Sequence, residues 1–149
     1  MKSYHTLEEE IDMVQRYLEH EPGLPQGEIT REFYLDPEVD TGTIVPRKLL
    51  QVFIEDSLRN AIVSDHTDAV LHISINRSNM GILIMVADLG LRNGDGVQVN
   101  QSCSEGIKLL NSYLPLFNRQ HQVSISYKML NLSTENGTPG VRVLITIKP

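Results

Sequence analysis

The chain has 149 residues, 40% of them hydrophobic, and a formal net charge of −6 at pH 7. This length is typical of a single domain that buries a proper core, and the hydrophobic content excludes an intrinsically disordered chain. The negative charge disfavours a protein that binds nucleic acid through its phosphates, because such binding requires a basic surface. An anionic ligand would therefore need local help from a cation or from backbone amides.

The sequence also indicates the compartment. Its single cysteine, Cys103, cannot form an internal disulfide, which is typical of a reducing compartment. No apolar run approaches the length of about 20 residues that crosses a bilayer. The N-terminus leads into a charged helix rather than a signal peptide. We therefore expect a cytoplasmic chain, which can also be the soluble domain of a membrane-anchored protein.

The first predicted helix runs from Thr6 to about Glu21, where a Pro-Gly pair ends the pattern. Thr6 and Glu9 have the spacing of a capping box, and the acidic run at residues 8–10 is expected to face solvent near the positive end of the helix. Apolar residues recur at helical intervals and form a narrow stripe: Leu7, Ile11, Val14 and Leu18. This stripe can pack on the domain or on a partner helix.

The next segment predicts a strand and then a longer amphipathic helix. Residues 29–35 alternate apolar and polar side chains, which is typical of a half-buried strand. Pro46, a residue favoured at the first helical position, is expected to open a helix that runs to Val63. One broad face of this helix carries apolar residues and a serine: Leu49, Leu50, Phe53, Ile54, Ser57, Leu58 and Ala61. Helical geometry places Glu55 nearly opposite this face, toward solvent.

The second half of the chain predicts strands near residues 71–76 and 82–87 and a helix at residues 107–117, bent or restarted near Pro115. Residues 123–127 and 141–147 have the pattern of a hairpin. The resulting order is α-β-α-β-β-α-β-β, without strict alternation. It predicts an α+β two-layer fold in which helices cover one face of a mixed sheet.

The clearest indication of a site is Asp88. It follows the unbroken apolar run Ile82–Ala87, and a long polar, glycine-bearing segment, Gly90–Glu105, comes after it. Ligands of α/β proteins gather beyond strand ends, and a long loop in a compact domain is usually functional or disordered. Asp88 can therefore accept a hydrogen bond from a ligand amine beside a lid. It can equally cap a helix or anchor the loop.

A second polar group lies on the Pro46–Val63 helix. Asp56 and Asn60 are one turn apart on one flank of its apolar face, with Arg59 just beyond. Carboxylate and carboxamide oxygens suit a hydrated divalent cation, and a guanidinium can bind a phosphate. The alternative is that these three are ordinary polar residues at the boundary of a buried face.

Five blocks cover nearly the whole chain: TLEEEIDMVQRYLEHE (Thr6–Glu21), EITREFYLD (Glu28–Asp36), VPRKLLQVFIEDSLRNAI (Val45–Ile62), VADLG (Val86–Gly90) and SEGIKLLNSYLPLFN (Ser104–Asn118). Their order and spacing resemble the C-terminal ATP-binding domain of LytS-type sensor histidine kinases, members of the GHKL ATPase superfamily. The resemblance implies a Bergerat fold, with ATP held between helices and a flexible lid. It implies an N-terminal linker helix at residues 1–22 and the ATP-binding domain at residues 23–149.

The resemblance also implies roles for individual residues. Asp56 stands where the family helix motif, P-x-x-L-Q-P-L-V-E-N-A-I-K-H-G, has the asparagine that binds magnesium. The D-x-G-x-G motif matches at Asp88 and Gly90, so Asp88 would accept a hydrogen bond from the adenine amino group. The second glycine motif, G-x-G-L-x-N, matches at Gly106 and Asn111. Arg59 and Asn60, on the same flank of the helix as Asp56, complete the expected set. The expected nucleotide-binding residues are Asp56, Arg59, Asn60, Asp88, Gly90, Gly106 and Asn111.

Three positions depart from these motifs. Asp56 replaces the asparagine and adds negative charge beside a triphosphate, an effect on the order of 4 kcal/mol at about 4 Å in a partly screened site. Arg92 and Lys108 each replace a glycine. These two side chains either fill space that the backbone would leave to a ligand or restore positive charge.

The function that the resemblance implies is binding of ATP with Mg²⁺ and presentation of the γ-phosphate to a phosphoacceptor histidine outside this chain, so no catalytic residue is expected within it. The implied partners are the phosphoacceptor domain, a response regulator and, in a homodimer, a second copy. One alternative is a degenerate GHKL domain that acts as a protein-interaction module. Another is a stand-alone serine kinase similar to the anti-sigma-factor kinases.

Overall fold

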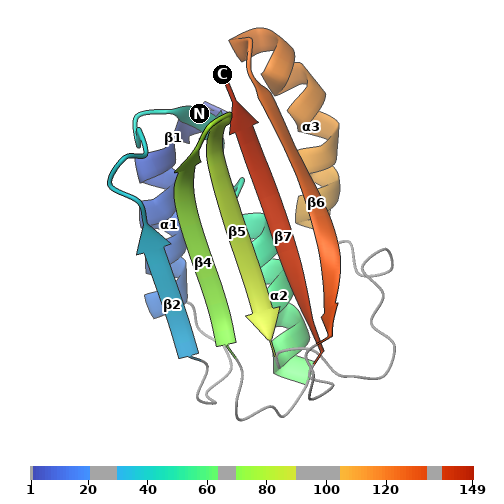
Figure 1. The fold of residues 1–149 in the computed structure, drawn as a ribbon. Helices are drawn as coiled ribbons and strands as arrows, with labels where there is room; N and C mark the ends of the chain where they lie inside the picture. The colour runs from blue at the N-terminus through green and yellow to red at the C-terminus, as the bar shows by residue number, and fades with distance from the viewer. Residues whose placement is uncertain (1, 21–29, 64–69, 90–104, 134–138) are drawn as a thin grey trace.

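The computed structural model describes residues 2–20, 30–63, 70–89, 105–133 and 139–149. Three helices lie on one face of a five-stranded sheet (Figure 1). The elements are β1 (Tyr4–Thr6), α1 (Leu7–His20), β2 (Thr30–Leu35), β3 (Ile44–Pro46), α2 (Gln51–Val63), β4 (Val70–Ser78), β5 (Gly81–Leu89), α3 (Glu105–His121), β6 (Ser124–Ser133) and β7 (Pro139–Lys148). The predicted α+β class, with helices on one face of a mixed sheet, is confirmed.

The large sheet has the strand order β2-β4-β5-β7-β6. β2 is parallel to β4, and the other three neighbouring pairs are antiparallel. The apolar run predicted at residues 82–87 forms most of β5, the central strand. Its alternate residues Ile82, Ile84 and Val86 are buried in the core. These residues lie on the side of β5 that faces the helices. Asp88 comes two residues after Val86 and therefore lies on the same side.

The first helix packs on the domain. Leu7, Ile11 and Val14 of α1 are buried in the same hydrophobic core as Phe53 of α2 and Ile84 of β5. The apolar stripe read from the sequence is therefore covered within this chain. Among the described residues, no helix is long and apolar enough to cross a lipid bilayer.

A small second sheet, absent from the sequence prediction, holds the N-terminus. β1 pairs with β3, so that Tyr4 lies opposite Pro46. The expectation that Pro46 opens a helix is therefore wrong, because Pro46 ends a strand and α2 begins at Gln51. Between them the backbone passes through the left-handed region at Lys48, with φ 69°. For a residue with a side chain this conformation costs about 1–2 kcal/mol.

The structure also corrects two other expectations. The prediction of a half-buried strand is wrong for β2, an edge strand that pairs with β4, because its residues from Thr30 to Tyr34 are exposed. Of the two alternatives predicted for α3, a bend or a restart near Pro115, the restart is wrong, because one helix of 17 residues continues through the proline. Leu110, Leu114 and Phe117 stay buried on both sides of the proline, so tertiary packing holds the helix together.

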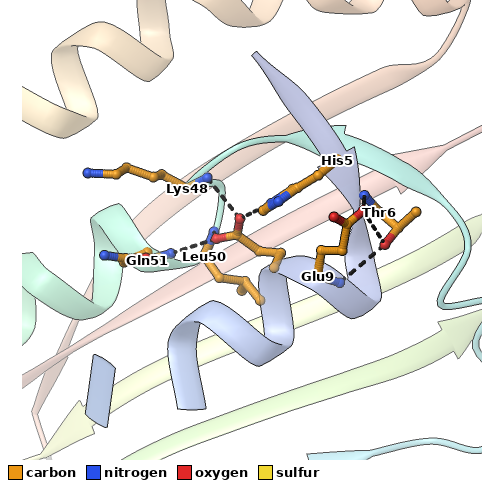
Figure 2. Close-up of polar contacts among 7 residues, drawn as sticks. His5, Thr6, Glu9, Lys48, Leu50 and Gln51 are labelled. Atoms are coloured by element: carbon orange, nitrogen blue, oxygen red, sulfur yellow. Dashed lines mark hydrogen bonds and ion pairs between the residues drawn. The ribbon is translucent and has the colours of Figure 1, made fainter. Parts of the chain in front are cut away.

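The predicted capping box at the start of α1 is confirmed (Figure 2). The backbone N–H and the hydroxyl of Thr6 each donate to Glu9 Oε1 at 3.0 Å, and the backbone N–H of Glu9 donates to Thr6 Oγ1 at 3.2 Å. The hydrogen bonds from Thr6 lower the pKa of the Glu9 carboxyl group. The one from the Thr6 backbone has the largest effect, and the one from its hydroxyl the next largest.

Glu10 is not on the solvent-facing surface expected for the acidic run, because its side chain is fully buried. Its Oε1 accepts hydrogen bonds from His5 Nε2 at 2.6 Å and from Lys48 N at 2.8 Å. Its Oε2 accepts from Leu50 N at 3.0 Å and from Gln51 N at 3.1 Å. Figure 2 shows these donors converging from the start of α2 and from β1. The left-handed turn at Lys48 brings its N–H to this carboxylate, which caps α2 from another helix.

We expect the Thr6→Ala substitution to raise the pKa of Glu9 toward the ordinary glutamate value, because one hydrogen bond to the carboxylate is lost. A lowered folded-state pKa adds stability that is present above the unfolded pKa and disappears as the pH falls through the folded pKa. The substitution should therefore destabilise the protein more at neutral pH than in acid. NMR titration of the Glu9 carboxyl group and urea unfolding at both pH values measure this; an unchanged pKa would contradict it.

We expect Glu10→Gln to destabilise the protein by about 2 kcal/mol or more, because an amide NH₂ would face donors that now bind a carboxylate oxygen. The matched control is Glu8→Gln, which makes the same chemical change at an exposed position and should stay within about 0.5 kcal/mol of the parent. Urea unfolding of the three proteins measures both effects. Equal stabilities of the two variants would show that the buried carboxylate does not hold α2.

Candidate functional site

Asp88 lies near the end of β5 and its side chain is only 1% exposed. Ser57 of α2 donates a hydrogen bond from Oγ to Asp88 Oδ2 at 2.6 Å. The backbone N–H of Val141, the residue opposite Asp88 on β7, donates to Oδ1 at 3.2 Å. The carboxylate is thus held between the sheet and α2 by donors from two different elements. The strand end that the sequence marked does carry a buried, oriented acceptor group.

The second predicted group comes from α2. Asp56 is 2% exposed and directly precedes Ser57. α2 therefore places the Asp56 carboxylate and the hydrogen-bond partner of Asp88 at neighbouring positions in the core. Asp56 is therefore not an ordinary residue at the boundary of a buried face. Arg59 is exposed. Asn60 lies in α2, but its side chain is outside the described part of the structure.

A partly open cavity of about 390 Å³ lies beside α2. Its walls come from α1, α2, α3 and the segments that precede α1 and α2: Ser3, Met13, Arg47, Lys48, Val52, Glu55, Gly106, Leu109, Leu110 and Tyr113. Among the predicted site residues that the structure describes, Gly106 reaches this wall. The expectation that Glu55 points to solvent is wrong: it is half-buried on the cavity wall and accepts a hydrogen bond from Gln51 Nε2 at 2.7 Å.

The remaining predicted residues of α3 lie apart from this wall. Asn111 accepts a hydrogen bond through Oδ1 from the hydroxyl of Tyr127 on β6. The Tyr127 ring in turn packs edge-on against Phe53 of α2, with ring centroids 4.9 Å apart. Lys108 is exposed, and its Nζ lies 3.5 Å from Glu105 Oε1. The Lys108 side chain thus extends along the surface of α3 instead of occupying the cavity.

Gly90, Arg92 and the rest of the predicted lid fall outside the described residues. Within the described ranges, no three side chains of histidine, cysteine, aspartate or glutamate form a group that could hold a metal ion. A cation at Asp56 would therefore take other ligands as well, from a bound molecule or from water. Such shared coordination is usual for Mg²⁺, which binds one or two carboxylates and completes its shell with phosphate and water oxygens.

Sequence reasoning missed Ser57 as a site residue. The signal in the sequence is a serine on an otherwise apolar helical face. A buried hydroxyl requires a hydrogen-bond partner, and the sequence offered Asp88 as an unassigned carboxylate at a buried strand end. Glu10 carried a similar signal, because helical spacing places it within the stripe formed by Leu7, Ile11 and Val14.

Comparison with known proteins adds the fold family. No protein-family description and no curated protein sequence matches the chain.

Among solved structures, the catalytic domain of the histidine kinase ThkA matches with a TM-score of 0.55 and 17% identity, over 100% of this chain and 97% of that one. The mycobacterial sensor histidine kinase MprB matches with a TM-score of 0.55 and 12% identity, over 100% and 99% of the two chains. The histidine kinase AdeS of Acinetobacter baumannii matches with a TM-score of 0.54 and 14% identity, over 98% and 68%. At these identities the likeness establishes the fold: this chain has the fold of histidine kinase catalytic domains.

Proposed function

We propose that this chain is the ATP-binding domain of a two-component sensor histidine kinase of the LytS type. It binds ATP with Mg²⁺ and presents the γ-phosphate to a phosphoacceptor histidine outside this chain. The observation that carries the proposal is the buried Asp88 carboxylate, fixed by Ser57 and Val141 at the end of the central strand. The kinase-like fold and the order of the sequence motifs support the same conclusion.

The residues present fit the two halves of an ATP–Mg²⁺ complex. A carboxylate accepts hydrogen bonds only, so Asp88 is suited to the amino group of adenine. Asp56 offers a hard oxygen ligand for Mg²⁺, and the exposed guanidinium of Arg59 suits a phosphate. Bound Mg²⁺ would neutralise phosphate charge. The role of this chain is then to position the nucleotide and balance its charge.

Phosphoryl transfer also needs parts that this domain does not supply. The acceptor would be a histidine of a separate phosphoacceptor domain, and the phosphoryl group would pass on to a response regulator. His5 does not suit this role, because it is 6% exposed and its Nε2 lies 2.6 Å from the Glu10 carboxylate. These partners, and assembly as a homodimer, belong to the proposal.

We expect the protein to bind Mg²⁺–ATP with micromolar affinity and the Asp88→Ala variant to lose this binding, because the adenine amino group loses its acceptor. Isothermal titration calorimetry measures both affinities. A cooperative thermal unfolding transition in the variant controls for loss of the fold. The absence of any binding to the parent protein at millimolar ATP would overturn the proposal in favour of a degenerate domain that serves as an interaction module.

Asp56 provides a second test, because its charge should repel a triphosphate that carries no metal. We expect Asp56→Asn to strengthen binding of ATP in EDTA by tenfold or more, since even a third of the interaction of about 4 kcal/mol expected at 4 Å corresponds to a factor of ten. Asp12→Asn, which changes an exposed residue of α1, is the matched control and should leave this affinity unchanged. Equal metal-free affinities of the parent protein and Asp56→Asn would place Asp56 away from the phosphates.

A further inference from the structure

The large sheet has one face that none of the described helices covers. In Figure 1 the three helices lie behind the sheet, and the opposite face is turned toward the viewer. Side chains alternate between the two faces of a strand, so the neighbours of the buried residues on each strand point away from the core. Apolar side chains from four strands gather on this open face: Tyr34, Leu83, Met85, Leu144 and Leu130.

The strand register places these apolar side chains next to one another. Met85 is paired with Leu144 on one side and with Ser74 on the other, and Ser74 is in turn paired with Tyr34. Tyr34 is 50% exposed and Leu83 is 37% exposed. Single exposed apolar residues need no explanation, but a contiguous apolar group on a protein surface indicates an interaction site.

Charged side chains of opposite sign lie at the two edges of this open face. On edge strand β2, Glu32 is paired in register with His72; its side chain is 56% exposed and lies 3.0 Å from His72 Nδ1. On the other edge strand, β6, Lys128 is exposed and paired with Leu144. Arg142 lies on the same face of the neighbouring strand β7. Within the described ranges, neither Lys128 nor Arg142 forms an ion pair.

This distribution of charge is complementary to a second copy of the same face. β5 is the central strand, with β2 at one edge and β6 at the other. When two such sheets pack face to face about a two-fold axis parallel to β5, the β2 edge of each copy lies opposite the β6 edge of the other. Glu32 of each copy then faces Lys128 of the other, so the attractive pair occurs twice. Leu83 and Met85 meet their own counterparts at the centre.

The open face is also large enough for a dimer. β4 to β7 have nine or ten residues each, which at about 3.4 Å per residue gives a length of roughly 30 Å. Five strands about 4.8 Å apart give a width of roughly 24 Å. The resulting area of about 700 Å² per copy is close to the roughly 800 Å² that each partner buries in a typical stable interface.

From this geometry we propose that two copies of this chain dimerise through the open face of the sheet, with Glu32 and Lys128 paired across the two-fold axis. The inference rests on the proposed function for the homodimer, whose surface it names, and it does not depend on nucleotide binding. A lipid surface fits this face less well. An anionic bilayer would attract Lys128 and Arg142 but would repel Glu32 and a chain with a net charge of −6.

Sedimentation velocity of the full chain without nucleotide tests the inference. We expect the parent protein to dimerise in the micromolar range. Glu32→Lys and Lys128→Glu should each weaken dimerisation about tenfold or more, because both copies of the attractive pair become repulsive. An equimolar mixture of these two variants should restore the dimer, since each variant supplies the charge that the other has lost at both contacts.

A second comparison tests the apolar centre. Leu83→Gln should weaken dimerisation, because it places a polar group in the middle of the interface. The matched control is Leu116→Gln, which makes the same change at a similarly exposed leucine on α3 and should leave dimerisation unchanged. Thermal unfolding of each variant shows that the compared proteins are folded.

Each contrary result has a distinct meaning. A parent protein that stays monomeric at millimolar concentration overturns the inference, as does a mixture of the two charge variants that associates no better than either alone. Dimerisation that is lost in Leu116→Gln but kept in Leu83→Gln places the interface on the helical layer and also overturns it. A parent that binds phosphatidylserine vesicles without self-association assigns the face to a membrane instead. None of these outcomes affects the ATP titrations, so the two proposals can fail separately.

Discussion

The arrangement of α1 and α2 depends on one buried carboxylate. Glu10 satisfies the free N–H groups at the start of α2, and these groups and His5 together compensate the burial of its charge. The left-handed backbone at Lys48 is the local cost of this arrangement, since it directs a third backbone N–H at the carboxylate. Two segments about forty residues apart in the sequence are thereby locked together, and the position of α2 follows from that of α1.

α2 is then fixed at a second point by another buried polar contact, between Ser57 and Asp88. Between the two contacts its apolar face, with Phe53 and Ile54 fully or almost fully buried, packs into the core. Apolar packing alone tolerates small shifts of a helix along a sheet. Buried hydrogen bonds do not, because each shift leaves a donor or an acceptor unsatisfied. One of the two contacts that set the register of α2, between Ser57 and Asp88, thus also belongs to the candidate site.

The layers of the fold could be predicted from the sequence, but these buried polar contacts could not. Two-residue and helical periodicity located the five strands of the large sheet and the three helices, because those patterns follow directly from burial on one face. Glu10 was misplaced because an acidic run at a helix start is usually solvated, and only the position of α2 shows what buries it. β1 and β3 are too short for any pattern, and their pairing explains why Pro46 ends a strand.

The structure also distinguishes two departures from the family motifs, at Lys108 and Asp56, that the sequence alone does not rank. Lys108 lies on the exposed side of α3 beside Glu105, so its bulk does not reduce the space between the helices. Asp56 is buried, so its charge acts in a medium that screens it far less than water does. Of these two substitutions, both within the described residues, the change from asparagine to aspartate therefore has the larger effect on the electrostatics of the site. In the proposed nucleotide complex, a buried charge at this position would favour a triphosphate that carries a bound cation over one that does not.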